Sequence, residues 1–228
     1  KSFDSVHLMP DLVVLDPRLT WTKDGKTIAE AGLAAFGRTL EAYIAPDKNP
    51  FMNAYAVTAL RFIRENLTDA VNKRCNKKVS LAIANAAAMS GCVISNTDQN
   101  VLNRLGQVFQ NIVHVHPGVI IGMCLHPFLD DCMKKDSSRI SSLLLPLGGD
   151  DKYAAMPEAG RAGEALRDIY EFSYEIYRAL KGKIPRTITE AGIPQYLMDD
   201  IFDVMNHEPD GAYLRSIIDR VSGGSIKA

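Results

Sequence analysis

The sequence predicts an all-α protein of about seven or eight helices, preceded by a short extended segment. Apolar residues recur at helical spacing from about residue 27 to residue 221. The alternating strands and helices that a nucleotide-binding sheet needs are absent from the sequence, as are the GxGxxG and GxxxxGK[ST] phosphate loops. We therefore expect residues 1–25 to form an extended lead-in and residues 26–228 to form a single helical domain.

The first elements in this prediction are the lead-in and one helix. Residues 8–20 contain the apolar run Leu12–Leu15, and Pro17 closes it, so we expect one extended piece. From about Thr27 the apolar residues take helical spacing, and Pro46 stops the pattern.

Two more helices follow in the first half of the chain. Asn49 offers a capping side chain and Pro50 a first helical residue that needs no N–H, and apolar residues then repeat every three or four positions. Residues 79–95 are rich in alanine, which predicts a central helix that its neighbours approach closely and bury.

The middle of the chain is less uniform. Residues 98–116 are ambiguous, because the first part fits a helix while residues 112–116 alternate like a strand. The run Val119–Leu125 is apolar on all sides and predicts a buried helix that ends near Pro127 or one turn later. Proline, glycine, serine and charged residues in residues 134–152 predict a loop.

Three helices complete the prediction. The clearest spans about residues 166–180, and Gly182 stands where a C-terminal glycine belongs. Pro194 begins the next helix, and a last helix runs from about residue 214 to residue 221.

The composition indicates a soluble cytoplasmic protein. Of the 228 residues, 46% are hydrophobic and the formal net charge is −1, so the chain can bury a core and has no electrostatic reason to bind nucleic acid or an acidic membrane. The four cysteines form no CxxC pair, which favours a reducing compartment. Neither a membrane-spanning run nor a signal peptide is evident in this sequence.

Five histidines and a few other residues are candidates for chemistry. His114 and His116 would point to one face if their segment were extended, which makes them either a two-point metal clamp or ordinary loop or core histidines. Cys124 is either a nucleophile or, as its apolar neighbours favour, a small buried side chain. Arg38 is either an anion anchor or a surface arginine whose stem packs on the helix.

Several segments, in the same order along the chain, resemble the helical part of the iron-containing alcohol dehydrogenases. They are MPDLVVLDPRLT at residues 9–20, AGLAAFGRTLEAY at residues 31–43, and the segments at residues 54–67, 90–96 and 184–193. The first two together are fairly specific, and the resemblance covers nearly the whole chain.

The resemblance implies an architecture and a set of cofactors. Members of this family are NAD(P)-dependent oxidoreductases with an N-terminal α/β domain for the nucleotide and a C-terminal helical domain for iron or zinc. Only the helical domain is matched here, so the resemblance implies no cofactor in this chain. It also implies a nucleotide-binding domain or chain as partner, and a possible homo-oligomer.

The family's metal ligands fall on residues of a different kind in this sequence. The resemblance places the aspartate ligand at Ala34, the first histidine ligand at Arg38, the second at Asn103 and a neighbouring histidine at Gln107. The last ligand belongs to a PHG tripeptide, which is HPG here, so His116 falls beside that position. An alanine, an arginine and an amide leave mainly positive charge and only weak carbonyl donation for a divalent cation, so we expect no metal and no catalytic residue.

Three functions remain open at this point. The first is the helical domain of an iron-containing alcohol dehydrogenase-like protein, metal-free and inactive by itself. The second is a non-catalytic binding or assembly module, in which the five positions line a vestigial cleft for a substrate or a small anion. The third is a metal-independent reductase that works with a separate nucleotide-binding chain.

Overall fold

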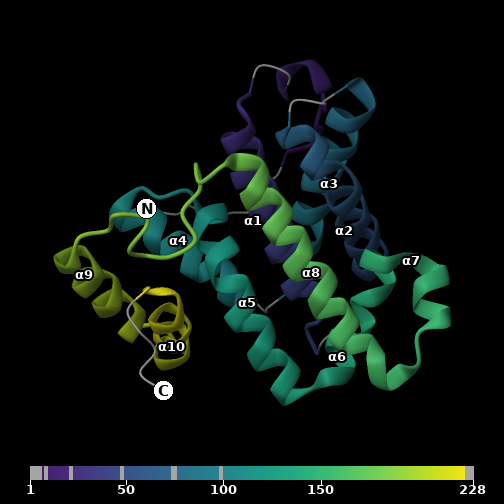
Figure 1. Cartoon of the computed structure of the whole chain (residues 1–228). Helices are drawn as coiled ribbons and strands as arrows, with labels where there is room; N and C mark the ends of the chain where they lie inside the picture. The colour runs from purple at the N-terminus through teal and green to yellow at the C-terminus, as the bar shows by residue number, and fades with distance from the viewer. Residues whose placement is uncertain are drawn as a thin grey trace.

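The computed structural model describes residues 7, 10–20, 23–46, 49–72, 76–97 and 100–223, and their main elements are helices (Figure 1). Within these ranges the prediction of an all-α fold is confirmed, and none of their helices is long and apolar enough to cross a membrane. The elements are η2 (Pro17–Thr20), α1 (Gly25–Tyr43), α2 (Pro50–Val71), α3 (Lys77–Ile94), α4 (Val101–Val113), α5 (Pro117–Lys135), α6 (Ser137–Ser142), α7 (Leu144–Ala155), α8 (Glu158–Leu180), α9 (Gln195–Asn206) and α10 (Gly211–Val221).

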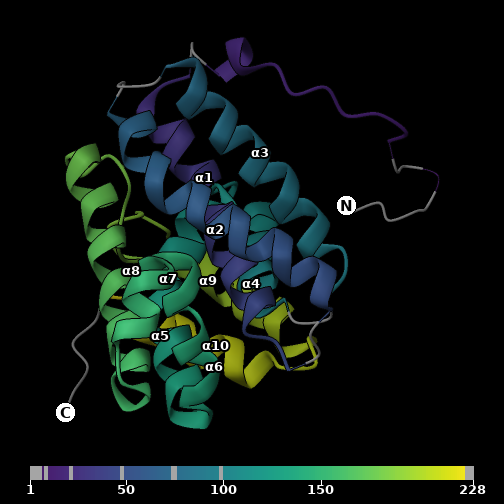
Figure 2. The same ribbon diagram turned by 90° about the vertical axis from the view of Figure 1, so that its right-hand side faces the viewer.

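Helix α1 is the centre of the packing. It contacts α2, α3, α4, α5 and α8, and its side chains Leu33, Phe36 and Leu40 are fully buried. The ring of Phe36 lies 4.9 Å from the ring of Phe172 in α8. Figure 2 shows α1 enclosed by its neighbours, while residues 10–16, before η2, run away from the helices. Because α1 is packed on several sides, the backbone that carries its outward-facing side chains is fixed in position.

Helix α5 is buried over its first half, as predicted, but it is longer than predicted. Every residue of the run Val119–Leu125 is buried, and the helix continues through Pro127 to Lys135. Phe128 and Leu129 are buried directly after the proline. Continuing the helix keeps these two side chains in the core, and this gain opposes the cost of the proline, about 3 kcal/mol in a helix interior.

The predicted loop over residues 134–152 is wrong, because α6 and α7 occupy most of it. The Asp136 carboxylate accepts hydrogen bonds from the backbone N–H of Ser138 at 3.0 Å and from its hydroxyl at 2.6 Å, which caps α6. Pro146 stands in the first turn of α7, where its missing N–H costs little, and Gly149 forms a kink with φ 83°. These two helices explain why the described residues form ten helices rather than seven or eight.

The prediction that α3 is a central, buried helix is also wrong. Only one face of α3 is buried, at positions Val79, Ser80, Ala86, Ser90 and Val93. This face packs against α1 and α2. The remaining alanines are small enough to stay exposed at little cost in free energy, so an alanine-rich helix fits a peripheral place as well as a central one.

In the described part of the ambiguous segment, residues 100–116, helix α4 covers Val101–Val113 and there is no strand. Helix α4 ends where His114 takes the left-handed conformation, with φ 57°. That turn directs the chain into α5 within three residues. The later predictions are confirmed: α8 ends before Gly182, which has φ 80°, and α9 and α10 follow.

Candidate functional site

A cavity of about 410 Å³ lies between α1, α3, the end of α4 and the start of α5. Most of its wall consists of small or apolar side chains from α1 and α3. Four polar side chains line it: Arg38 of α1, Ser90 of α3, Gln110 of α4 and His116, the residue that caps the start of α5. The cavity is therefore a mostly apolar space with a few polar groups, the usual composition of a small-molecule site.

The structure brings together three of the five positions that the family resemblance singles out. Ala34, Arg38 and His116 all line this cavity. Asn103 and Gln107 are not among the described residues that line it. Asn103 and Gln107 stand seven and three residues before Gln110, on the same face of α4. Their part in a cleft stays a prediction.

Gln110 is the polar residue that the sequence reasoning missed. It stands three residues after Gln107 and seven after Asn103, which is one face of a helix. Extending the helical reading of α4 by one turn would have found Gln110.

Arg38 is a cation without a counter-charge. Its Nε is buried and has no hydrogen-bond partner, and it forms no ion pair within the part of the chain that the structure describes. Burial lowers the pKa of the guanidinium. The pKa of an arginine is so high that the group stays charged all the same, so the cavity carries one unneutralised positive charge.

His116 offers the cavity an N–H group rather than a lone pair. Its Nδ1 accepts a hydrogen bond of 3.1 Å from the backbone N–H of Gly118, at the N-terminal end of α5. In a neutral imidazole whose Nδ1 is an acceptor, Nε2 carries the proton. Burial lowers the pKa of His116 and Arg38 acts in the same sense, while Glu30 opposes them. The neutral ring with its proton on Nε2 is therefore the form present at neutral pH.

A buried hydroxyl pair fixes α1 against α3 beneath the cavity. Thr39 donates to the Ser90 hydroxyl at 2.8 Å, and Ser90 lies 3.2 Å from the carbonyl oxygen of Ala35, to which it donates. The hydroxyl of Ser90 lines the cavity but is already engaged in this pair. Arg38 is adjacent to Thr39, so the pair also fixes the position of the arginine along α1.

The residues at this place do not fit an iron or zinc ion. Ala34 has no donor atom, and the guanidinium of Arg38 repels a dication. His116 holds its proton on Nε2, and its Nδ1 lone pair is engaged with Gly118, so neither ring nitrogen is free to ligate. In the described ranges no three His, Cys, Asp or Glu side chains are grouped so that they could hold a metal.

Three further residues considered from the sequence, Cys124, His114 and His126, have surroundings that explain them as parts of the fold. Cys124 is fully buried, and burial raises the pKa of its thiol to about 12, which favours the buried side chain over the nucleophile. His114 caps α4, so it does not share the face of an extended strand with His116. The ring of His126 packs against Tyr170, with centroids 4.1 Å apart.

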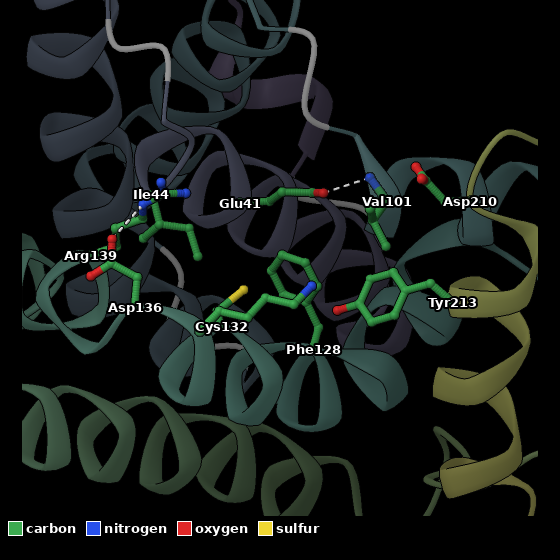
Figure 3. A pocket seen from close by; sticks show the side chains of 10 residues that line it. Glu41, Ile44, Val101, Phe128, Cys132, Asp136, Arg139, Asp210 and Tyr213 are labelled. Atoms are coloured by element: carbon green, nitrogen blue, oxygen red, sulfur yellow. Dashed lines mark hydrogen bonds and ion pairs between the residues drawn. The ribbon is translucent and has the colours of Figure 1, made fainter.

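A second cavity, of about 270 Å³, lies where α1, α4, α5 and α10 meet (Figure 3). The carboxylate of Glu41 reaches from α1 to the start of α4 and accepts backbone N–H bonds from Val101 at 2.5 Å and Leu102 at 3.0 Å. This replaces the capping side chain that α4 lacks at Asn100. The charged side chains around it have partners: Asp136 pairs with Arg139, Asp210 pairs with Arg104, and Lys135 lies over the ring of Tyr213. We interpret this cavity as a structural junction.

We expect the free energy of unfolding to fall as the pH rises, because the buried Glu41 side chain then loses its proton. Burial raises the pKa of Glu41 from 4.5 to about 7, so between these values the folded protein holds a proton that the unfolded chain has released. The free energy of unfolding should fall across this window by up to about 3 kcal/mol because of this residue. His116 and His126, whose pKa values are lowered, act in the opposite sense below about pH 6.5.

The test is therefore the difference between the wild type and Glu41→Gln in urea unfolding. The variant cannot titrate at this position, so it should gain stability relative to the wild type between about pH 5 and about pH 8. A difference that stays the same at both pH values would contradict the assignment.

Comparisons with known proteins agree with the resemblance in the sequence. The profile described as "Fe-containing alcohol dehydrogenase family, C-terminal" matches residues 28–206. The long-chain-alcohol dehydrogenase 1 of Geobacillus thermodenitrificans is 22% identical over 195 residues, which are 86% of this chain and 47% of that protein. The 1,3-propanediol dehydrogenase of Klebsiella pneumoniae is 28% identical over 191 residues, which are 84% of this chain and 45% of that protein.

Solved structures show the same fold. A 1,3-propanediol oxidoreductase superposes with a TM-score of 0.76 at 19% identity, covering 90% of this chain and 54% of that one. The sulfoacetaldehyde reductase of Bifidobacterium kashiwanohense, solved with NAD+, has a TM-score of 0.68 at 14% identity, with 92% and 54% covered. The chain spans about half the length of the relatives it matches. It belongs to the Fe-containing alcohol dehydrogenase family, and it corresponds to the C-terminal helical part of that family's proteins.

Proposed function

We propose that this chain is the helical domain of an NAD(P)-dependent oxidoreductase-like protein that binds no iron or zinc and transfers no hydride by itself. The observation that carries the proposal is Arg38, whose unpaired guanidinium lines the cavity beside Ala34 and His116. Family membership supports the oxidoreductase origin. A metal ion that polarises an alcohol oxygen would need anionic or neutral donors where this chain has an alanine and a cation.

The partners that go with this proposal follow from the family. A nucleotide-binding domain or chain would supply the NAD(P) site, and a homo-oligomer is possible as the assembly. No nucleic acid or membrane partner is expected, because the formal net charge is only −1. If the partner chain restored activity without any metal, the chain would be part of a metal-independent reductase.

An assay of the purified chain tests the first proposal. We expect no alcohol-dependent reduction of NAD+ or NADP+, either without metal or after addition of Fe²⁺ or Zn²⁺ under anaerobic conditions. Cofactor titration should also give no saturable binding to the chain alone. Metal-stimulated turnover by the chain itself would contradict the proposal.

A second candidate function is a non-catalytic binding module that takes a small anion in the same cavity. The unpaired charge of Arg38 favours it, because a partly buried cation gains most from an anion that can hydrogen-bond to it. Small anions should raise the melting temperature of the wild type by mass action, and Arg38→Ala should abolish the increase. An unchanged increase in that variant would remove Arg38 from the site.

A further inference from the structure

We propose that the cavity between α1, α3, α4 and α5 binds a short-chain monocarboxylate, with Arg38 as its charged partner and the N–H of His116 as a second donor. This inference rests on the proposed function, because it takes the family's metal position to be a metal-free anion site. It goes further by naming the chemical class of the ligand.

The charge of the cavity matches a single negative charge. Arg38 is the charged side chain that lines it, and no acidic side chain of the described residues lines it. Glu30 lies near enough to His116 to influence the pKa of the imidazole. The carboxylate of Glu30 is itself paired, with its Oε1 3.7 Å from the Nζ of Lys26. A monoanion neutralises Arg38, whereas a dianion such as hydrogen phosphate would leave one charge unpaired in a partly desolvated place.

The donor geometry suits a planar carboxylate. A guanidinium presents parallel N–H groups that match the two oxygens of a carboxylate. His116 adds one N–H from Nε2, since its Nδ1 is engaged with Gly118. Gln110 lines the same cavity with an amide that has no partner in the described residues and can serve either as donor or as acceptor.

The walls of the cavity suit a short apolar tail. Ala31, Ala87, Gly91 and Ile94 face it from α1 and α3, and the hydroxyl of Ser90 is already bound to Ala35. About 410 Å³ is more than a carboxylate group fills, so a chain of a few carbon atoms can enter with it. Butyrate combines the charge, the planar head and the tail in one small probe.

The experiment is calorimetric titration of the purified chain in chloride buffer with four probes: butyrate, butyramide, n-butanol and inorganic phosphate. Butyramide keeps the shape of butyrate without its charge, and phosphate provides charge without the planar head or the tail. We expect butyrate to bind more tightly than the other three probes. The dissociation constant of butyramide should be about tenfold or more higher than that of butyrate, because the amide loses the charge-assisted contact with Arg38.

Two variants locate the site. Arg38→Gln should weaken butyrate binding about tenfold or more. Gly91→Leu should block it sterically while keeping Arg38, because a Cβ at Gly91 meets no atom within 4 Å and the new side chain grows from the cavity wall. Gly163→Leu is the matched control, since Gly163 in α8 is equally open and lies outside the cavity; its binding should equal that of the wild type.

The outcomes separate this inference from the proposed function. Phosphate binding more tightly than butyrate, with loss in Arg38→Gln, would overturn the carboxylate assignment and leave the anion site standing. Butyrate binding that survives both Arg38→Gln and Gly91→Leu would overturn the site. No binding of any anion by the folded wild type would overturn both the inference and the anion module, while the metal-free proposal would still depend on its own assay.

Discussion

Gly118→Ala is expected to lose at least about 4 kcal/mol of folding free energy, enough to leave little folded protein. A Cβ at Gly118 would lie 1.7 Å from the carbonyl oxygen of Glu30 and 2.6 Å from its carbonyl carbon. Both atoms belong to the backbone of α1, so no side chain can rotate away to make room. The start of α5 would have to move off α1, and His116 would move with it.

The measurement is urea unfolding followed by far-ultraviolet circular dichroism, with Gly163→Ala as control. The helix of Gly163 leaves open space at the Cβ position, so this alanine should be neutral or stabilise by up to about 1 kcal/mol through helix propensity. A Gly118→Ala protein as stable as the wild type would contradict the contact between α1 and α5 and the position of His116.

Phe172→Ala is expected to cost about 3 to 5 kcal/mol, the second largest effect. Phe172 is fully buried in α8 and packs against the ring of Phe36 in α1, and the guanidinium of Arg64 lies 5.2 Å from the centre of its ring. Truncation removes the aromatic pair and leaves a cavity beside the central helix.

Two companion variants make this prediction specific. Phe172→Leu keeps most of the apolar volume and should cost less than half as much. Tyr174→Ala, an exposed aromatic residue of the same helix, should change stability by no more than about 0.5 kcal/mol. Equal losses for Phe172→Ala and Tyr174→Ala would show that α8 does not pack on α1 as described.

The sequence was sufficient for the fold where local signals and burial agree. Asn49 and Pro50 begin α2, Gly182 follows α8, and the run Val119–Leu125 is buried on all sides. It was misleading where tertiary packing overrides a local signal. Pro127 does not end α5, because buried residues follow it directly, and the small residues of α3 line an open cavity instead of a crowded core.

The candidate site was predictable to a similar degree. The family resemblance pointed to Ala34, Arg38 and His116, and the structure places all three around one cavity. Two features depended on coordinates. The protonation of His116 follows from its bond to Gly118, and the missing counter-charge of Arg38 can be known only from its surroundings.

The most direct test of the account is the metal content of the protein. The chain should be purified without chelator from cells grown with iron and zinc, and analysed by inductively coupled plasma mass spectrometry, followed by calorimetric titration with Fe²⁺ and Zn²⁺. We predict far less than one metal ion per chain and no saturable binding. One tightly held iron or zinc ion per chain, lost in His116→Ala, would contradict the account.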